Sequence, residues 1–163
     1  MNWVSRIYRK IRHFLIKGAF RKCLSKEMTE EVGEEFLKIL LKLLNVACYL
    51  DDYLQKSIDG FNGRIQFRNR NNAIRVLAEF KENRLDSREL DPDEELSPLP
   101  DATIVFKNYE ALMNFLLPKG GKRDVLRSLL QNEVQFEGNL NYIYRFAFLA
   151  THAQLPFFNM LKN

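Results

Sequence analysis

The sequence predicts an α+β domain preceded by helices. Short apolar runs with the period-two alternation of strands occur in the same part of the chain as longer runs whose apolar residues recur at helical spacing. Of the 163 residues, 46% are hydrophobic and 13 are phenylalanine, so the chain can bury a core of its own. We therefore expect one domain, residues 59–163, with two helical segments before it, residues 1–26 and 27–58.

The segment 1–26 is predicted to form a basic amphipathic helix. It contains eight Lys and Arg residues and no acidic residue, so the rest of this chain of net charge +4 carries a net charge of −4. A basic helix with Trp near one end is typical of segments that lie in the interface of an anionic membrane. The residues expected to contact a membrane surface are Trp3, Arg6, Ile7, Arg9, Lys10, Phe14 and Lys17.

Two other interpretations of this helix remain open. Its apolar side could pack on the domain while the charged side stays in solvent, or its basic side could lie along nucleic-acid phosphates. No recognisable nucleic-acid motif follows the helix, so we expect no nucleic-acid partner.

Residues 27–58 are expected to be helical and to pack on the domain or to dock a protein partner. One helix is predicted over residues 29–55, because acidic residues at its start suit the positive end of a helix dipole. An apolar stripe over residues 36–50 would form its buried side.

The domain is predicted to begin with a turn at Asp59-Gly60 and two strands, residues 64–67 and 74–80. Residues 86–101 are predicted to form an exposed loop, because acidic residues alternate there with three prolines. The negative charge of this loop could attract the basic N-terminal segment, although solvation alone accounts for it.

The later elements include two capped helices. Asn108 and Asn139 are suitable N-cap residues, and Gly138 ends a strand. Apolar residues cover most of the circumference of the final helix, so it should be buried or contact something apolar on a second side. The predicted elements are a strand at 102–106, helices at 109–117 and 123–130, a strand at 134–137, and a helix at 139–153.

The run Val134-Gln135-Phe136-Glu137-Gly138-Asn139-Leu140, together with the strand 102–106 and the paired helices after it, resembles the sterol-transfer domain of the sterol carrier protein family. The resemblance extends back to Gly63 and covers about the last three-fifths of the chain. It implies a twisted, mainly antiparallel five-stranded sheet covered by helices, with an apolar tunnel between them. Bacterial relatives in that family include accessory factors of quinone biosynthesis.

The resemblance implies a lipid-binding wall on the inner side of the helices. Each wall residue could equally be ordinary core. The residues expected to line the tunnel are Phe106, Leu112, Phe115, Leu116, Leu126, Leu130, Phe136, Ile143, Phe146 and Phe148.

Residues able to carry chemistry are few. His13 and His152 lack the spacing of a zinc site. Asp51 and Asp52, expected on the surface at a helix C-terminus, would point about 100° apart and could not share a proton. Gly120-Gly121-Lys122 lacks the rest of a phosphate-binding loop. The sequence therefore predicts no catalytic residue, no metal ion and no cofactor.

The expected location is the cytoplasm, with peripheral membrane association. Cys23 and Cys48 are expected to be free thiols, the N-terminus does not have the pattern of a signal peptide, and no apolar run reaches about 18 residues.

The sequence thus predicts a non-enzymatic protein that binds an apolar lipid, whether sterol-like, acyl or prenyl, and carries or presents it at a membrane surface. One alternative is a scaffold or accessory protein of a lipid or quinone biosynthesis complex, with partners bound through helices in residues 1–57. A second alternative is a small enzyme that acts on a lipid substrate.

Overall fold

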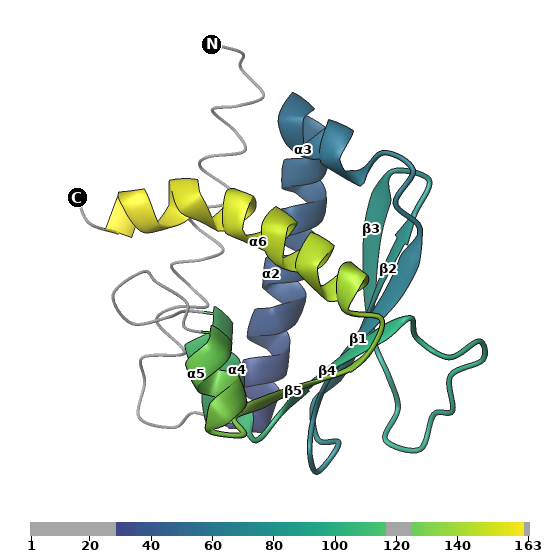
Figure 1. Ribbon diagram of the computed structural model, residues 1–163, viewed down its shortest axis with the longest axis vertical. Coiled ribbons are helices and arrows are strands. Elements are labelled where there is room, and N and C mark those ends of the chain that lie inside the picture. The colour runs from purple at the N-terminus through teal and green to yellow at the C-terminus, as the bar shows by residue number, and fades with distance from the viewer. Residues whose placement is uncertain (1–28, 117–124, 162–163) are drawn as a thin grey trace.

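A computed structural model describes the backbone of residues 29–116 and 125–161 and the side chains of residues 29–116 and 127–152. Five strands form one sheet in the order β3-β2-β1-β4-β5, and the helices lie on one side of it (Figure 1). The elements are α2 (Glu30–Leu50), α3 (Asp52–Ile58), β1 (Gly63–Asn69), β2 (Arg75–Lys81), β3 (Arg84–Glu89), β4 (Ala102–Phe106), α4 (Tyr109–Leu116), α5 (Val125–Leu130), β5 (Val134–Gly138) and α6 (Leu140–Leu161).

The predicted α+β architecture, with a mainly antiparallel five-stranded sheet, is confirmed. Strands β1 and β2, β2 and β3, and β4 and β5 pair in antiparallel fashion, and only β1 and β4 are parallel neighbours in this sheet. Ile65 of β1 lies opposite Ala78 of β2 and Ala102 of β4. The register therefore sets the apolar residues of neighbouring strands side by side on one face.

Strand β3 corrects the prediction that residues 86–101 form a loop throughout, because residues 86–89 belong to the sheet. Glu82 and Asn83, with φ of 52° and 60°, form the two-residue turn that leads from β2 into β3. This hairpin has a weak sequence signal, since its turn contains no glycine and Leu85 alone is buried in the strand.

The helix predicted over residues 29–55 is two helices that meet at Asp51. The Asp51 carboxylate accepts hydrogen bonds from the backbone N–H groups of Tyr53 and Leu54, at 2.9 and 3.1 Å, and so caps α3. Asp51 is thus the C-cap of α2, as predicted, and also the N-cap of α3. Asp52 is the first residue of α3, where its charge suits the positive end of the helix, so for Asp52 the predicted place at a helix C-terminus is corrected.

The core lies between the sheet and the helices. The apolar stripe of α2 packs against the chain's own sheet, as its buried residues share one cluster with those of the strands. Burial raises the pKa of the Cys48 thiol to about 11, with a further contribution from the negative charge of Asp51, so this side chain is a protonated part of the core. The buried residues of α2 are Gly33, Glu34, Phe36, Leu37, Leu41, Leu43, Leu44, Ala47 and Cys48.

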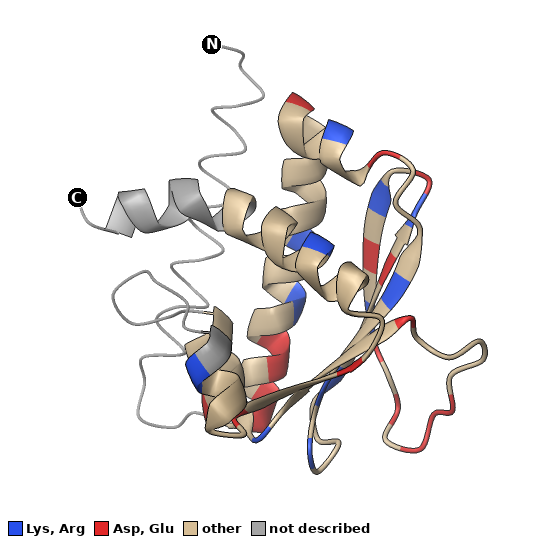
Figure 2. Cartoon of the chain, viewed as in Figure 1, with Lys and Arg blue, Asp and Glu red and all other residues tan. Residues whose placement is uncertain are grey.

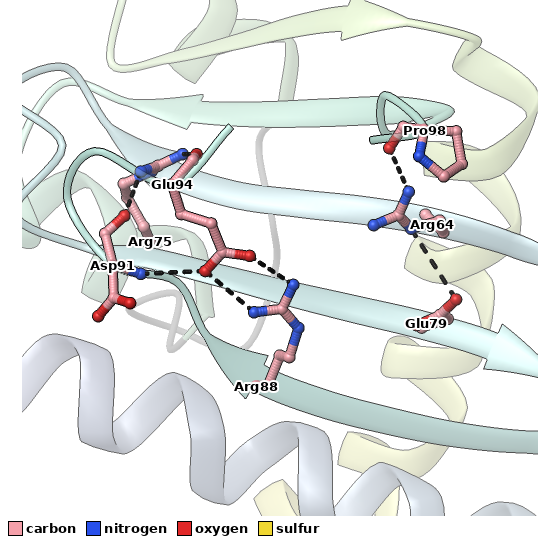
Figure 3. Close-up of polar contacts among 7 residues, drawn as sticks. All are labelled: Arg64, Arg75, Glu79, Arg88, Asp91, Glu94 and Pro98. Carbon is pink, nitrogen blue, oxygen red and sulfur yellow. Dashed lines mark hydrogen bonds and ion pairs between the residues drawn. The ribbon is translucent and has the colours of Figure 1, made fainter. Parts of the chain in front are cut away.

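The loop over residues 90–101 lies on the opposite side of the sheet from the helices (Figure 1). It is mostly exposed, as predicted, but arginines of the sheet hold it in place (Figure 3). Arg75 donates hydrogen bonds to the carbonyl oxygens of Asp91, Pro92 and Glu94, and Arg64 donates to that of Pro98. Acidic residues gather in this loop and at the start of α2 (Figure 2).

Glu34 of α2 is a buried carboxylate close to a second carboxylate. Its side chain lies 3.8 Å from the Nζ of Lys38, which also contacts Glu35 and Glu89 at 3.1 and 3.0 Å. Burial, and then the negative charge of Glu89, raise the pKa of Glu34 above its ordinary value. Because the folded state disfavours the ionised form, this group lowers stability once the pH rises above the pKa that it has in the unfolded chain.

Replacing Glu34 with Gln is therefore expected to stabilise the protein at pH 7, by on the order of 1 kcal/mol. This gain in stability should become smaller as the pH falls through the acid range, because Glu34 is then protonated in both the folded and the unfolded protein. Urea unfolding at several pH values measures both effects. The matched control is Glu35→Gln, an exposed neighbour that contacts the same lysine, and it should change stability little. An unchanged or lower stability of Glu34→Gln at pH 7 would contradict this account.

Candidate functional site

The candidate site is the apolar layer between the sheet and the helices. Helices α4 and α6 both contact β4 from the same side, and α6 also contacts β1 and β5. Alternation along the strands directs Phe67, Ile104 and Phe136, which are neighbours in the register, toward these helices. The cluster that fills the layer consists of apolar side chains, with the polar Asn69 buried at the end of β1.

Most of the predicted wall residues come together in this layer. Among them, Phe136 is partly buried and packs against the core cluster. The ring of Phe106 lies 5.6 Å from that of Phe115, and the ring of Phe67 lies 5.0 Å from that of Phe146. These edge-to-face contacts stabilise the layer beyond simple burial. The buried wall residues are Phe106, Leu112, Phe115, Leu116, Ile143 and Phe146.

Two predicted wall residues, Leu130 and Phe148, lie outside this layer. Leu130 is 76% exposed and Phe148 is 41% exposed, so neither is enclosed by the fold. The Leu126 side chain lies outside the described residues, as do Trp3, Arg6, Ile7, Arg9, Lys10, Phe14 and Lys17, which were predicted to bind a membrane.

Phe148 belongs instead to an exposed aromatic cluster with Tyr53 and His152. Its ring centroid lies 6.2 Å from that of Tyr53 and 4.2 Å from that of His152. The Nδ1 of His152 lies 3.0 Å from the carbonyl oxygen of Phe148, one turn earlier in α6. His152 and Asp51 thus both have local structural roles, which gives no support to a catalytic one.

Phe61 and Tyr142 also belong to this layer, although neither was among the predicted wall residues. Phe61 stacks against Phe80 and Tyr142, with centroids 4.6 and 5.5 Å apart. Tyr142 lies directly over Gly63, where a Cβ atom would come within 2.1 Å of the ring. The signal for this contact is a glycine at the start of a strand, because glycine there often marks a close approach.

Helix α6 is fixed at the position where it crosses the sheet. The Asn139 side chain accepts a hydrogen bond from the N–H of Asn141 at 3.0 Å, which confirms its capping role. Gly138 has a φ of 81°, and a Cβ atom there would lie 2.5 Å from the carbonyl oxygen of Asp101. Arg145 donates to the carbonyl oxygens of Ser57 and Asp59 and so ties α6 to the end of α3.

Polar groups near the layer are engaged in structure. Asn69, fully buried, accepts from the N–H of Ile74 at 2.9 Å and donates to Glu30 at 3.1 Å. Within residues 29–116 and 125–161, no group of three or more His, Cys, Asp and Glu residues is arranged to hold a metal ion. Of the helices in the described part of the chain, none combines the length and the apolar composition that crossing a bilayer requires.

Comparison with solved structures identifies the fold as sterol-carrier-protein-like. The chain is similar to a "UbiJ-SCP2 Ubiquinone synthesis protein", with 17% identity and a TM-score of 0.54 over 70% of this chain and 91% of that one. It is also similar to apo sterol carrier protein 2 from Yarrowia lipolytica, with 14% identity and a TM-score of 0.51 over 75% and 92% of the two chains. No protein-family model matches the chain, and no curated protein matches it in sequence.

Proposed function

We propose that this protein binds an apolar lipid between its sheet and its helices and carries or presents that lipid without catalysing a reaction. The observation that carries the proposal is a sterol-carrier-protein-like fold whose sheet and helices enclose a continuous layer of apolar side chains. A guest held there would lie over Ile104 and Phe106 of β4, between α4 and α6. The tunnel that holds it is part of the proposal.

The affinity would come from burial of the hydrocarbon. Each methylene group removed from water contributes about 0.8 kcal/mol, so a chain of eight to ten carbons gains roughly 6–8 kcal/mol before the cost of ordering it. Since rings such as Phe106 and Phe115 contact each other, the guest must move side chains or helices aside. Displacement of α4 and α6 from β4 would open the layer while leaving the sheet hydrogen bonds intact.

A second candidate function is that of an accessory protein in quinone biosynthesis. Similarity to a structure named as a ubiquinone synthesis protein favours this reading. The lipid would then be a prenylated intermediate, held in the same layer and presented to an enzyme. Docking of a partner on the apolar stripe of α2 does not agree with the fold, because that stripe packs on the chain's own sheet.

The third part of the proposal concerns the N-terminal segment. Its eight basic residues and no acidic ones, with Trp3 and other apolar residues at helical spacing, would adsorb to an anionic membrane. Each basic residue near such a surface contributes about 1 kcal/mol, which gives reversible binding and no stable insertion. Adsorption would hold the lipid-binding domain next to the source or the destination of its guest.

Replacing Leu116 with Phe is expected to weaken lipid binding by about tenfold or more, because the larger side chain takes up space inside a buried layer. Titration of the full-length protein with a fluorescent fatty acid and with a fluorescent prenyl alcohol measures the affinity. Leu130→Phe is the matched control, since it makes the same change on a side chain that is 76% exposed. Melting curves of both variants separate lost binding from lost folding. No binding of either probe by the unsubstituted protein, or equal binding by both folded variants, would contradict the lipid-carrier proposal.

Reversing the charge of Arg6, Arg9, Lys10 and Lys17 to Glu in the full-length protein is expected to abolish sedimentation with vesicles that contain phosphatidylserine. The unsubstituted protein should bind these vesicles and should leave purely zwitterionic ones unbound. A control with the same change in net charge reverses four exposed residues of the domain, Lys56, Lys81, Arg84 and Lys107. Equal losses in the two variants would show that overall charge, and not the N-terminal segment, determines binding.

A further inference from the structure

A second recess lies on the other face of the sheet, opposite the helices. It is an open pocket of about 300 Å³ between the outer face of β1 and β2 and the loop over residues 90–101. This volume is at the lower end of the range for small-molecule sites. The lining residues are Gln66, Arg75, Glu94, Glu95, Leu96, Leu99 and Pro100.

The loop that forms one wall of this pocket is held in a defined position. Its ends are fixed by backbone hydrogen bonds, from Leu90 to Arg75 and from Asp101 to Arg64, both of 2.9 Å. In between, the Arg75 guanidinium binds three loop carbonyls and Arg88 binds the Glu94 carboxylate in bidentate fashion, at 2.6 and 3.1 Å (Figure 3). The pocket therefore exists before any ligand arrives, which lowers the entropic cost of binding.

Gln66 contributes the uncharged polar group of the pocket, beside the charged Arg75, Glu94 and Glu95. It is 8% exposed and points to the outer face, where it lies beside Leu77 of β2 and Thr103 of β4. Its side-chain amide has no hydrogen-bond partner among the described residues, and it is not one of the buried unpaired groups, so the amide atoms are open to solvent in the pocket. Because the amide lines the pocket, a bound molecule can supply both the donor and the acceptor that it lacks.

The charges around the pocket disfavour an anion. Glu94 is ionised, since its hydrogen bonds from Arg88 lower the pKa of this carboxyl group. Glu95 and the nearby loop residues Asp91 and Asp93 add negative charge. The Arg75 Nη groups donate to the loop carbonyls, whereas its Nε–H is buried and has no partner among the described residues. Leu96, Leu99 and Pro100 contribute apolar side chains to the pocket, and Leu99 is 79% exposed.

We propose that this outer-face pocket binds an uncharged small molecule with a compact apolar body and one amide-like group. The amide-like group pairs with the Gln66 side chain through two reciprocal hydrogen bonds, and the apolar body lies against Leu96, Leu99 and Pro100. The site is independent of the layer between the sheet and the helices. It would allow the protein to respond to a second ligand of quite different chemistry.

Benzamide is a suitable probe, because it joins a ring to an amide. Titrated into the ¹⁵N-labelled full-length protein, it should saturate in the millimolar range, as expected for so small a ligand. The side-chain NH₂ signals of Gln66 and the backbone signals of Leu96 and Leu99 should shift most. Benzoate, which differs mainly by its negative charge, should bind at least about fivefold more weakly. Equal or tighter binding of benzoate would overturn the assignment of an uncharged ligand.

Two variants test the contacts. Gln66→Leu should weaken benzamide binding at least about fivefold through loss of both hydrogen bonds, whereas Gln135→Leu, an exposed glutamine on the same sheet face outside the pocket, should not change it. Leu99→Ser, at an exposed position where folding is not at risk, should also weaken binding severalfold. Absence of saturable shifts in the unsubstituted protein, shifts centred elsewhere, or unchanged affinity in Leu99→Ser would overturn the proposal.

Discussion

The inner face of the sheet must be kept from water, and this requirement sets the position of the helices α2, α4 and α6. Residues such as Ile65, Phe67 and Ile104 are fully buried only because these helices cover them. The apolar stripe of α2 is itself buried by this contact with the sheet, so it is not free for a partner. The face that remains in solvent carries arginines and carboxylates instead, and these hold the loop over residues 90–101 (Figures 2 and 3).

The parts of the fold that could be predicted from the sequence are those with a strong local signal. Gly138 and Asn139 mark the start of α6. They could be identified from the sequence because few residue types cap a helix or adopt a left-handed backbone conformation. The hairpin into β3 was missed, since its turn is made by Glu82 and Asn83 without glycine. The break at Asp51 was missed as well, because helical periodicity continues on both sides of it and only the capping carboxylate marks it.

Residues of the candidate site could be predicted where a side chain is buried because it lies on the inward face of its helix or strand. Phe106 and Leu112 are buried in β4 and α4, in agreement with the wall that the family resemblance and the helical spacing implied. Leu130 and Phe148 fit the same spacing yet are exposed, because periodicity defines one side of a helix and does not say how far a neighbouring element covers it. The Gln66 pocket could not be foreseen at all, since it depends on where arginines of the sheet place a distant loop.

Lipid binding as proposed requires the layer between the sheet and the helices to open. The most direct test is NMR of the full-length protein with ¹³C-labelled methyl groups. The protein is saturated with a fatty acid, or with a lipid whose headgroup is deuterated and whose hydrocarbon chain is not. The account predicts intermolecular NOEs from the hydrocarbon chain to the methyl groups of Leu112, Leu116 and Ile143, all of which are buried in the described structure. NOEs confined to surface methyl groups such as those of Leu130, or none at all under saturating ligand, would contradict it.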